Sequence, residues 1–397
     1  MKTESYVVKQ DITESYLWKG KTPLLSRLDM ELTERCNNNC IHCCINLPAN
    51  DLAVRRRELT TAEAKEILKE AISLGCLSLR FTGGEPLLRE DFEELYIFAR
   101  KIGLKVLIFT NATLITSNLA ELFSRTPPLK KIEVSVYGMK NESYEAVTRT
   151  AGSFEAARRG INLLLEYKVP FVVKGALLPS NKGEINEFEA WAGAIPWMDK
   201  PPSYSMFFDL RCRRDGKKNE LITKLRLTPQ DSIKILTRRS QEYLKEMKEF
   251  CSKFMRPPGN RLFSCGSGQG SGCIDAYGNF QLCMMLRHPD TVYDLRRGSL
   301  KDALTNFFPK IREIEATNPD YIGRCARCFL KGLCEQCPAK SWTEHGSLDT
   351  PVEYLCEVAH TQARFLGLLE DRERAWEVKD WKSRVDEFVK APVIGHE

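Results

Sequence analysis

The 397-residue sequence contains no apolar run close to the roughly 20 residues that a membrane-spanning helix needs. Its first thirty residues carry Glu4, Asp11 and Glu14 where a secretion signal would have an apolar core. Internal repeats and low-complexity tracts are absent, and histidine is scarce, with five residues. The net charge of +6 is too small and too evenly spread to indicate nucleic-acid binding. These absences predict a cytoplasmic protein without membrane or nucleic-acid partners.

Cysteine, in contrast, is abundant, with 15 residues. A hydrophobic content of 43% and a charged content of 28% are ordinary for a globular enzyme, and they exclude a disordered or fibrous protein. In a secreted chain the cysteines would predict disulfides, whereas in a cytoplasmic chain of this size they favour metal or redox chemistry. The spacing of the cysteines decides between the two interpretations.

Short apolar runs alternate with helical patterns over the first 210 residues. Leu28, Met30 and Leu32 alternate with polar residues, which predicts a strand that leads directly to Cys36. Further strands are predicted near 77–82, 104–110, 132–137, 170–178 and 204–210, and helices over 61–74, 90–102, 116–124, 153–167 and 184–192. Six strands that alternate with helices predict an α/β fold with a parallel sheet or barrel, two strands short of a full eight-stranded barrel.

The first cysteine motif is a C-x3-C-x2-C loop made by Cys36, Cys40 and Cys43 directly after the first predicted strand. Three thiolates on a compact loop can converge on one metal cluster. When the loop is read alone, a zinc site with His42 or Cys44 as the fourth ligand is the alternative.

The second motif, Gly83-Gly84-Glu85-Pro86, follows the second predicted strand. Two glycines let the backbone approach a ligand closely, and a carboxylate can pair with an ammonium group. In this order the two motifs resemble those of the radical S-adenosylmethionine (SAM) enzymes. The resemblance implies a partial (β/α)6 TIM-like barrel and a 4Fe–4S cluster on the three cysteines, with one open iron that binds SAM. It also implies reductive cleavage of SAM to a 5′-deoxyadenosyl radical.

The same resemblance implies the residues that hold SAM. Gly83, Gly84, Glu85 and Pro86 match the family motif that holds the SAM amino group. Asn111, Ser135 and Arg149, at or after the ends of the third and fourth strands, match positions that contact the ribose and carboxylate. Capping and loop hydrogen bonds are the alternative role for these last three residues. His42 departs from the family, which usually has an aromatic or hydrophobic residue before the third cysteine.

Seven cysteines in the C-terminal third have an order that resembles the SPASM extension of radical SAM enzymes. The resemblance implies two auxiliary 4Fe–4S clusters, an outer one on Cys325, Cys328, Cys334 and Cys356 and an inner one on Cys265, Cys283 and Cys337. The fourth inner ligand would be Cys273 or Cys251, or an iron would be left open for substrate. The commonest SPASM form has three residues between its last paired cysteines, where this chain has Glu335-Gln336. A zinc knuckle is the alternative for the closely spaced cysteines.

The predicted organisation has five parts: an N-terminal extension (1–26), the radical SAM barrel (27–210), a basic bridging region (211–262), the SPASM domain (263–360) and a helical tail (361–397). The basic run is either a solvated loop or a contact for an anionic substrate; its members are Arg211, Arg213, Arg214, Lys217 and Lys218. In the tail, a charged helix over 369–388 is expected to pack on the body through Trp376, Trp381, Val385 and Phe388.

Three functions fit these patterns. The first is a peptide or protein maturase that oxidises a side chain or forms a thioether or carbon–carbon crosslink, supplied with electrons by a flavodoxin or ferredoxin. Only 35 residues precede Cys36, too few for a winged-helix leader-recognition domain, so a separate leader-recognition protein is a possible partner. The second is a tetrapyrrole-modifying enzyme, similar to a heme-pathway decarboxylase, in which the arginine-rich segment 211–226 grips propionates. The third is a non-catalytic iron–sulfur or zinc scaffold.

Catalytic acid–base residues are left unassigned, because no spacing selects among the candidates Tyr137, His288, Glu344 and His345.

Overall fold

The computed structural model describes residues 24–208, 210 and 216–392. Six parallel strands form its N-terminal half, in the sheet order β1-β4-β5-β6-β7-β8. They are β1 (Arg27–Thr33), β4 (Ser78–Gly83), β5 (Lys105–Thr110), β6 (Ile132–Val136), β7 (Phe171–Ala176) and β8 (Ser203–Ser205). Each lies at one of the six predicted positions, and the predicted α/β fold with a six-stranded partial barrel is confirmed.

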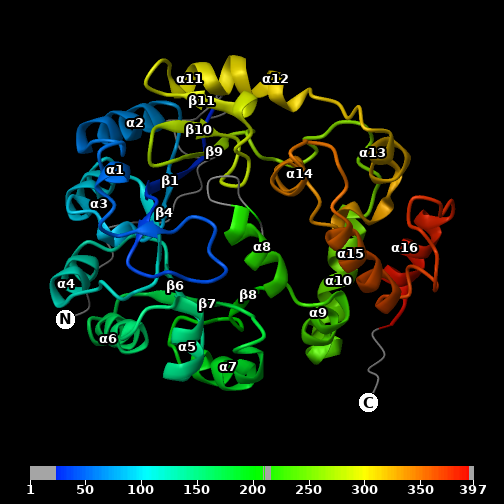
Figure 1. Cartoon of the computed structure of the whole chain (residues 1–397), viewed down its shortest axis with the longest axis horizontal. Coiled ribbons are helices and arrows are strands. Elements are labelled where there is room, and N and C mark those ends of the chain that lie inside the picture. Colours follow the sequence, from blue (N-terminus) through cyan, green and yellow to red (C-terminus); the bar gives the residue numbers. More distant parts are fainter. Residues whose placement is uncertain (1–23, 209, 211–215, 393–397) are drawn as a thin grey trace.

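Helices between the strands cover the outer face of this sheet (Figure 1). They are α1 (Leu52–Arg55), α2 (Thr61–Ser73), α3 (Phe92–Lys101), α4 (Ser117–Arg125), α5 (Asn141–Thr148), α6 (Ser153–Glu166) and α7 (Ile185–Gly193). Helix α2 shows why they form. Thr60 and Glu63 make a capping box at its start, and Ala64, Leu68 and Ala71 share the face that it buries. The sequence predicted α2, α3, α4, α6 and α7, and it missed α1 and α5.

The sheet continues beyond β1 with strands from the C-terminal half. Strand β9 (Ser271–Ile274) pairs in parallel with β1, and β10 (Asn279–Gln281) and β11 (Val292–Asp294) follow antiparallel. The junction is also held by a buried ion triad. The guanidinium of Arg287 lies 2.7 Å from Glu31 Oε2 on β1 and 3.1 Å from Asp275 Oδ2 after β9. The C-terminal half is therefore joined to the barrel by backbone pairing and by buried charge.

Most of the remaining helices lie on the right of Figure 1, and α11 and α12 run above the barrel. They are α8 (Gly216–Leu225), α9 (Pro229–Leu236), α10 (Ser240–Phe254), α11 (Leu300–Asp302), α12 (Phe308–Arg312), α13 (Pro319–Gly323), α14 (Pro338–His345), α15 (Glu353–Phe365) and α16 (Trp381–Lys390). Helix α8 lies between the two halves in that view. Within the described residues, no helix combines the length and the apolar character that crossing a membrane requires.

The predicted tail helix over 369–388 is wrong in its first half, because the helix begins at Trp381. Trp381, Val385 and Phe388 pack into a hydrophobic cluster with α10 and α15, as expected. Trp376 lies in the turn before α16, where its ring stands 5.4 Å from that of His360. The four side chains therefore do not form a single helical stripe.

Candidate active site

The three N-terminal cysteines lie on a loop between two short paired strands, β2 (Arg35–Cys36) and β3 (Leu47–Pro48). The loop is fastened across the barrel, because the backbone N–H of Asn39 donates to the carbonyl oxygen of Thr148 at 2.9 Å. One cavity of about 150 Å³ is bordered by all three predicted ligands, Cys36, Cys40 and Cys43. The structure thus brings the three thiols to one place.

Burial disfavours the ionised form of these thiols. It raises the pKa of Cys36 to about 12, and the Glu85 carboxylate adds to the rise. Burial also raises the pKa of Cys40, with a further contribution from Cys43. Buried thiolates need a nearby cation to be stable, and the iron of an iron–sulfur cluster supplies one. The all-thiol donor set of this loop therefore fits such a cluster.

The glycine motif lies at the end of β4, where the backbone closely approaches the segment that leads from β1 to the cysteine loop. Gly83 has φ +131°, a conformation that residues with side chains rarely adopt. A methyl group on Gly83 would overlap the carbonyl oxygen of Thr33, and one on Gly84 would overlap that of Arg35. Both glycines border the cavity. Their small size therefore lets two backbone segments meet beside the three cysteines.

Glu85 does not border the cavity, but its carboxylate bonds to two residues that do. Its carboxylate is fully buried and accepts hydrogen bonds from Thr110 Oγ1 and from the backbone N–H of Asn111, each at 2.8 Å, and from that of Leu87 at 3.2 Å. Burial raises its pKa to about 7 against the opposing effect of these bonds. Pro86 is buried behind it at the start of a short 3-10 helix. The carboxylate thus holds the end of β5 in place.

Two of the three polar residues predicted to contact SAM border the cavity. Asn111 and Ser135 do so from the C-terminal ends of β5 and β6. Asn111 also contacts the cysteine loop, with Nδ2 3.8 Å from Cys36 Sγ. Arg149 is not brought to the cavity: it caps α5 in the left-handed conformation, with φ 52°, and its side chain is exposed.

The barrel interior carries paired charges that the sequence analysis missed. Lys174 on β7 is the one charged residue among the described residues that border the cavity. Its Nζ lies 3.1 Å from the centre of the Phe109 ring and 3.1 Å from Glu133 Oε2. Arg80 stands 4.6 Å from the same ring and pairs with Asp29 at 3.1 Å. The available signal was the polar residue at every second position of β1, β4 and β6, which marks an inner face.

Several polar atoms around the cysteine loop find no hydrogen-bond partner among the described residues. They are Oδ1 and Nδ2 of Asn38, Nδ1 of His42 and the hydroxyl of Tyr144. The His42 ring lies 5.2 Å from each of the Tyr137 and Phe208 rings. Buried polar atoms are normally paired, so these atoms suit a site that a bound polar group completes. No three His, Cys, Asp or Glu side chains of the described ranges gather closely enough to hold a single metal ion.

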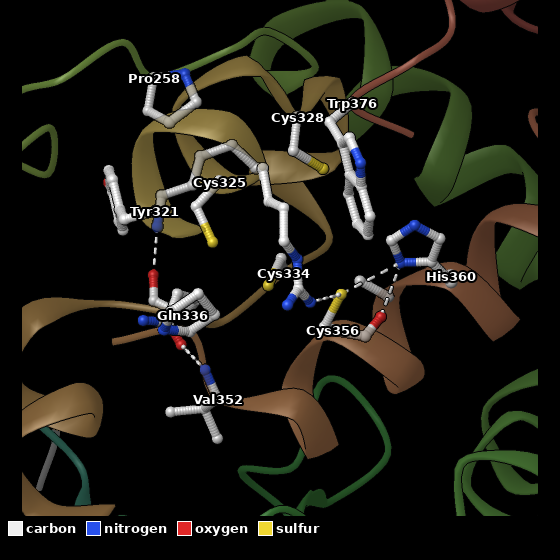
Figure 2. A pocket seen from close by; sticks show the side chains of 14 residues that line it. Pro258, Tyr321, Cys325, Cys328, Cys334, Gln336, Val352, Cys356, His360 and Trp376 are labelled. Atoms are coloured by element: carbon white, nitrogen blue, oxygen red, sulfur yellow. Dashed lines mark hydrogen bonds between the residues drawn. The ribbon is translucent and has the colours of Figure 1, made fainter. Parts of the chain in front are cut away.

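The four cysteines predicted to hold the outer cluster border one pocket in the C-terminal half. They are Cys325, Cys328, Cys334 and Cys356. Figure 2 shows their sulfur atoms turned toward a shared space, with Trp376 and His360 at one side. Gln336 closes the other side, where its Oε1 accepts from the backbone N–H of Val352 at 3.0 Å. The structure therefore collects four thiols that are up to 31 residues apart in the sequence.

Two nitrogen-bearing side chains stand beside Cys356 in this pocket. The guanidinium of Arg324 lies 3.9 Å from Cys356 Sγ and forms an ion pair with Glu353 at 2.7 Å. His360 accepts the backbone N–H of Ala375 at Nε2, so in its neutral form it carries the proton on Nδ1. That nitrogen lies 2.8 Å from the carbonyl oxygen and 3.6 Å from the sulfur of Cys356. Both groups would stabilise a thiolate at this position.

Of the three predicted inner ligands, Cys283 and Cys337 are partly buried and Cys265 is exposed. Burial raises the pKa of Cys283, and Cys337 and Cys265 add to the rise. Cys273 is buried on β9 opposite Asp29, with its Sγ 3.7 Å from the carbonyl oxygen of Ile274. Cys251 is buried in the hydrophobic cluster formed by α10, α15 and α16. The fourth inner ligand stays a prediction.

The acid–base candidates have different surroundings. Tyr137 borders the cavity of the N-terminal cysteines. Glu344 forms a largely buried ion pair with Arg226, which occupies its carboxylate. His288 caps a short 3-10 helix, where its Nδ1 accepts the backbone N–H of Asp290 at 3.1 Å. His345 ends α14 with an exposed side chain. Of the four, Tyr137 alone is placed at the cavity.

Comparison with known proteins agrees with this architecture. Residues 30–192 match the sequence model of the radical SAM superfamily. The AdoMet-dependent heme synthase of Methanosarcina barkeri, where AdoMet is SAM, is 26% identical over 337 residues, which are 80% of this chain and 92% of that protein. The solved structure of native anSMEcpe with bound AdoMet has a similar fold, with a TM-score of 0.57, 16% identity and coverage of 86% of this chain and 97% of that one.

A second similar structure is that of Streptococcus suis SuiB bound to the precursor peptide SuiA. It has a TM-score of 0.55 and 16% identity, and it covers 84% of this chain and 76% of that chain. At this identity the likeness to both solved structures concerns the fold.

Proposed function

We propose that this chain, which belongs to the radical SAM superfamily through residues 30–192 and has the fold of its SPASM-containing members, cleaves SAM reductively and abstracts hydrogen from a carboxylate-bearing tetrapyrrole. Cys36, Cys40 and Cys43 would hold the SAM-binding cluster. Cys325, Cys328, Cys334 and Cys356 would hold an outer auxiliary cluster, and Cys265, Cys283 and Cys337, with Cys273 as the candidate fourth ligand, an inner one. The observation that carries the proposal is the gathering of the first three thiols and the glycine motif around one cavity.

If bound at these cysteines, 4Fe–4S clusters would supply the electron that splits SAM into methionine and the 5′-deoxyadenosyl radical, and would accept the electron that the substrate gives up. The contribution of the chain's own residues would be to bind and orient SAM and the substrate. Gly83 and Gly84 form part of the cavity wall, and the side chains of Asn111 and Ser135 lie beside them. Glu85 acts indirectly, by holding Asn111. A flavodoxin or ferredoxin is the expected external reductant.

The same proposal assigns the parts of the chain. The barrel spans 27–210, the basic bridging region 211–262, the auxiliary-cluster domain 263–360 and the helical tail 361–397, after an extension over 1–26. Of these boundaries, the first barrel strand, at Arg27, is supported by β1.

A tetrapyrrole substrate is supported by the heme synthase relative, which aligns with most of both chains. A structural observation agrees with it. Lys218, the last residue of the basic run, donates to Asn46 Oδ1, and Asn46 borders the cavity. Lys218 thus lies beside the site, where its cation would meet a propionate. Arg211, Arg213 and Arg214 lie outside the described residues, as does Cys212, and Arg226 is taken up by Glu344.

The proposed reaction converts a propionate side chain of the tetrapyrrole to a vinyl group. The 5′-deoxyadenosyl radical takes one hydrogen atom from the CH2 group next to the ring and becomes 5′-deoxyadenosine. The substrate radical then loses CO2 and one electron, and a vinyl group remains. Each propionate so converted consumes one SAM and one electron from the reductant, and it returns one electron.

The test uses anaerobic protein with reconstituted iron, SAM, dithionite and iron coproporphyrin as the probe. We expect 5′-deoxyadenosine in the mixture and a porphyrin mass that falls by CO2 and hydrogen. The triple variant Cys36→Ala, Cys40→Ala, Cys43→Ala should abolish both products. Cys44→Ala, in the same loop, is the matched control and should keep both. Continued SAM cleavage by the triple variant would overturn the proposal.

A peptide substrate is the second candidate, and a groove favours it. The groove, of about 600 Å³, runs along β8 at the edge of the sheet and is bordered by Pro201, Ser203, Tyr204, Ile235 and Leu236. An edge strand can pair with an extended peptide. A mass shift on a peptide encoded beside the gene, with an unchanged porphyrin, would select this candidate.

A further inference from the structure

Three consecutive asparagines in the cysteine loop have three different environments. Asn37 is satisfied within the protein, because its Nδ2 donates to Thr113 Oγ1 at 2.7 Å and its Oδ1 accepts from Asn111 Nδ2 at 3.0 Å. Asn39 has an exposed side chain, which water can satisfy. Asn38 lies between them with 4% of its surface exposed. Neither its Oδ1 nor its Nδ2 has a partner in the part of the chain that the structure describes.

An unpaired buried carboxamide is costly. Leaving one buried donor or acceptor without a hydrogen bond destabilises a fold, and Asn38 leaves both. A hydrophobic residue would avoid the cost, so the amide suits a position where a bound group completes its hydrogen bonds. Asn38 borders the same cavity as Cys36, Cys40 and Cys43. The group that occupies this cavity is therefore the natural partner of its amide.

The backbone fixes where the Asn38 side chain can reach. Its own N–H donates to Cys36 Sγ at 3.4 Å, so the residue wraps around the first sulfur. The side chain of Asn46 donates to the carbonyl oxygens of Asn38 and Cys40, at 3.4 Å and 3.5 Å. The Asn38 backbone is thus held beside Cys36 and Cys40, and the residue borders the cavity that their thiols share.

The geometry points to Asn38 as a positioning residue whose carboxamide N–H donates a hydrogen bond to a sulfur of the SAM-binding iron–sulfur cluster. This inference rests on the proposed function, which places that cluster on Cys36, Cys40 and Cys43. A donor to a cluster sulfur stabilises the reduced form more, because that form carries one more negative charge. Asn38 would therefore raise the reduction potential of this cluster and make SAM cleavage accessible to a weaker reductant.

The test compares Asn38→Leu with Asn39→Leu in the reconstituted full-length protein. Leucine keeps the approximate size of asparagine and has no donor, and Asn39→Leu makes the same exchange at the exposed neighbour. A redox titration followed by electron paramagnetic resonance, with the SAM-responsive signal as the marker, reads the cluster directly. At a fixed potential we expect Asn38→Leu to lower the ratio of reduced to oxidised cluster about threefold to tenfold, the effect of one hydrogen bond. Asn39→Leu should leave the ratio unchanged.

A second variant covers the case in which leucine prevents iron binding. Asn38→Asp keeps the shape and replaces the donor with a carboxylate, so it should shift the potential in the same negative direction. An unshifted potential in an iron-replete variant overturns the inference. A weaker affinity for SAM with an unshifted potential also overturns it, because the amide would then contact SAM. Wild-type protein that binds no SAM-responsive cluster would instead contradict the proposed function, so the two failures are distinguishable.

Discussion

The carboxylate of Glu85 accepts the backbone N–H of Asn111 at 2.8 Å and so ties the end of β4 to the end of β5. From there Asn111 extends its side chain to Cys36. The acidic residue of the glycine motif thus supports the cavity from behind, and the two glycines supply the wall. Removing the carboxylate should disturb the site through Asn111 even though Glu85 does not border the cavity.

The buried state of Glu85 predicts a pH dependence of stability in cluster-free protein. Its pKa is raised from 4.5 to about 7, chiefly by burial. Between these values the folded protein holds a proton that the unfolded chain has released, so the free energy of unfolding falls as pH rises from 4.5 through 7. The contribution is up to about 3 kcal/mol. Urea unfolding at pH 5 and pH 8 should show a smaller decrease for Glu85→Gln than for the wild type.

Glu93→Gln is the control, because Glu93 is an exposed carboxylate on the nearby α3. The free energy of unfolding of the Glu93→Gln variant should change with pH as it does in the wild type. If the free energy of unfolding fell equally from pH 5 to pH 8 in Glu85→Gln and the wild type, a raised pKa at Glu85 would be contradicted.

The close approach of two backbone segments at the glycine motif predicts that a side chain at Gly84 would clash. Gly84→Ala places a methyl group against the carbonyl oxygen of Arg35, which directly precedes Cys36. We expect a loss of about 1–3 kcal/mol in the free energy of unfolding, together with reduced iron binding after reconstitution. Gly193→Ala is the matched control, because a methyl group there meets nothing within 4 Å. A Gly84→Ala protein with normal stability and iron content would show that the two backbone segments can make room for a methyl group.

Local sequence patterns specified the barrel well. The alternation in β1 and the capping box of α2 are short-range signals, and both elements formed where the sequence predicted them. The pairing of β9 with β1 joins segments about 240 residues apart, and four residues that include a glycine give little strand signal. Arg149 shows a different limit. Its place after a strand was readable, but the left-handed turn that exposes it depends on how α5 ends.

The roles within the site were less readable than its location. The motif order located Glu85, yet only the fold shows that its carboxylate bonds to Thr110 and Asn111. The sequence did not single out Asn38, because it is one of three consecutive asparagines. Its environment follows from how the loop wraps around Cys36, which a linear pattern does not express.

The ion triad between the two halves predicts a large effect at Arg287. Arg287→Met would leave the carboxylates of Glu31 and Asp275, which are 1% and 4% exposed, buried without their cation. We expect a loss of about 3–5 kcal/mol in the free energy of unfolding measured with urea. Adding Glu31→Gln should recover part of it, because one uncompensated charge is removed.

Arg297→Met is the control for the triad. Arg297 is 88% exposed on the adjoining turn and pairs with Asp294 at 3.4 Å, so its loss should cost less than about 1 kcal/mol. Similar losses in the free energy of unfolding for Arg287→Met and Arg297→Met would contradict the view that the buried triad stabilises the junction between the two halves.

The pocket in the C-terminal half predicts a specific loss of metal. Cys328 borders it with three other cysteines, and a hydroxyl is a poorer iron ligand than a thiolate, so Cys328→Ser should remove about four irons per chain after reconstitution. Cys76→Ser is the control: Cys76 is buried in the barrel core, where its Sγ donates to the carbonyl oxygen of Ser78 at 3.4 Å, and iron content should be unchanged. Metal analysis of both variants also separates the alternatives. Loss of a single zinc from Cys328→Ser, with iron unchanged, would identify the four cysteines as a zinc site, since one tetrahedral ion takes all four thiolates.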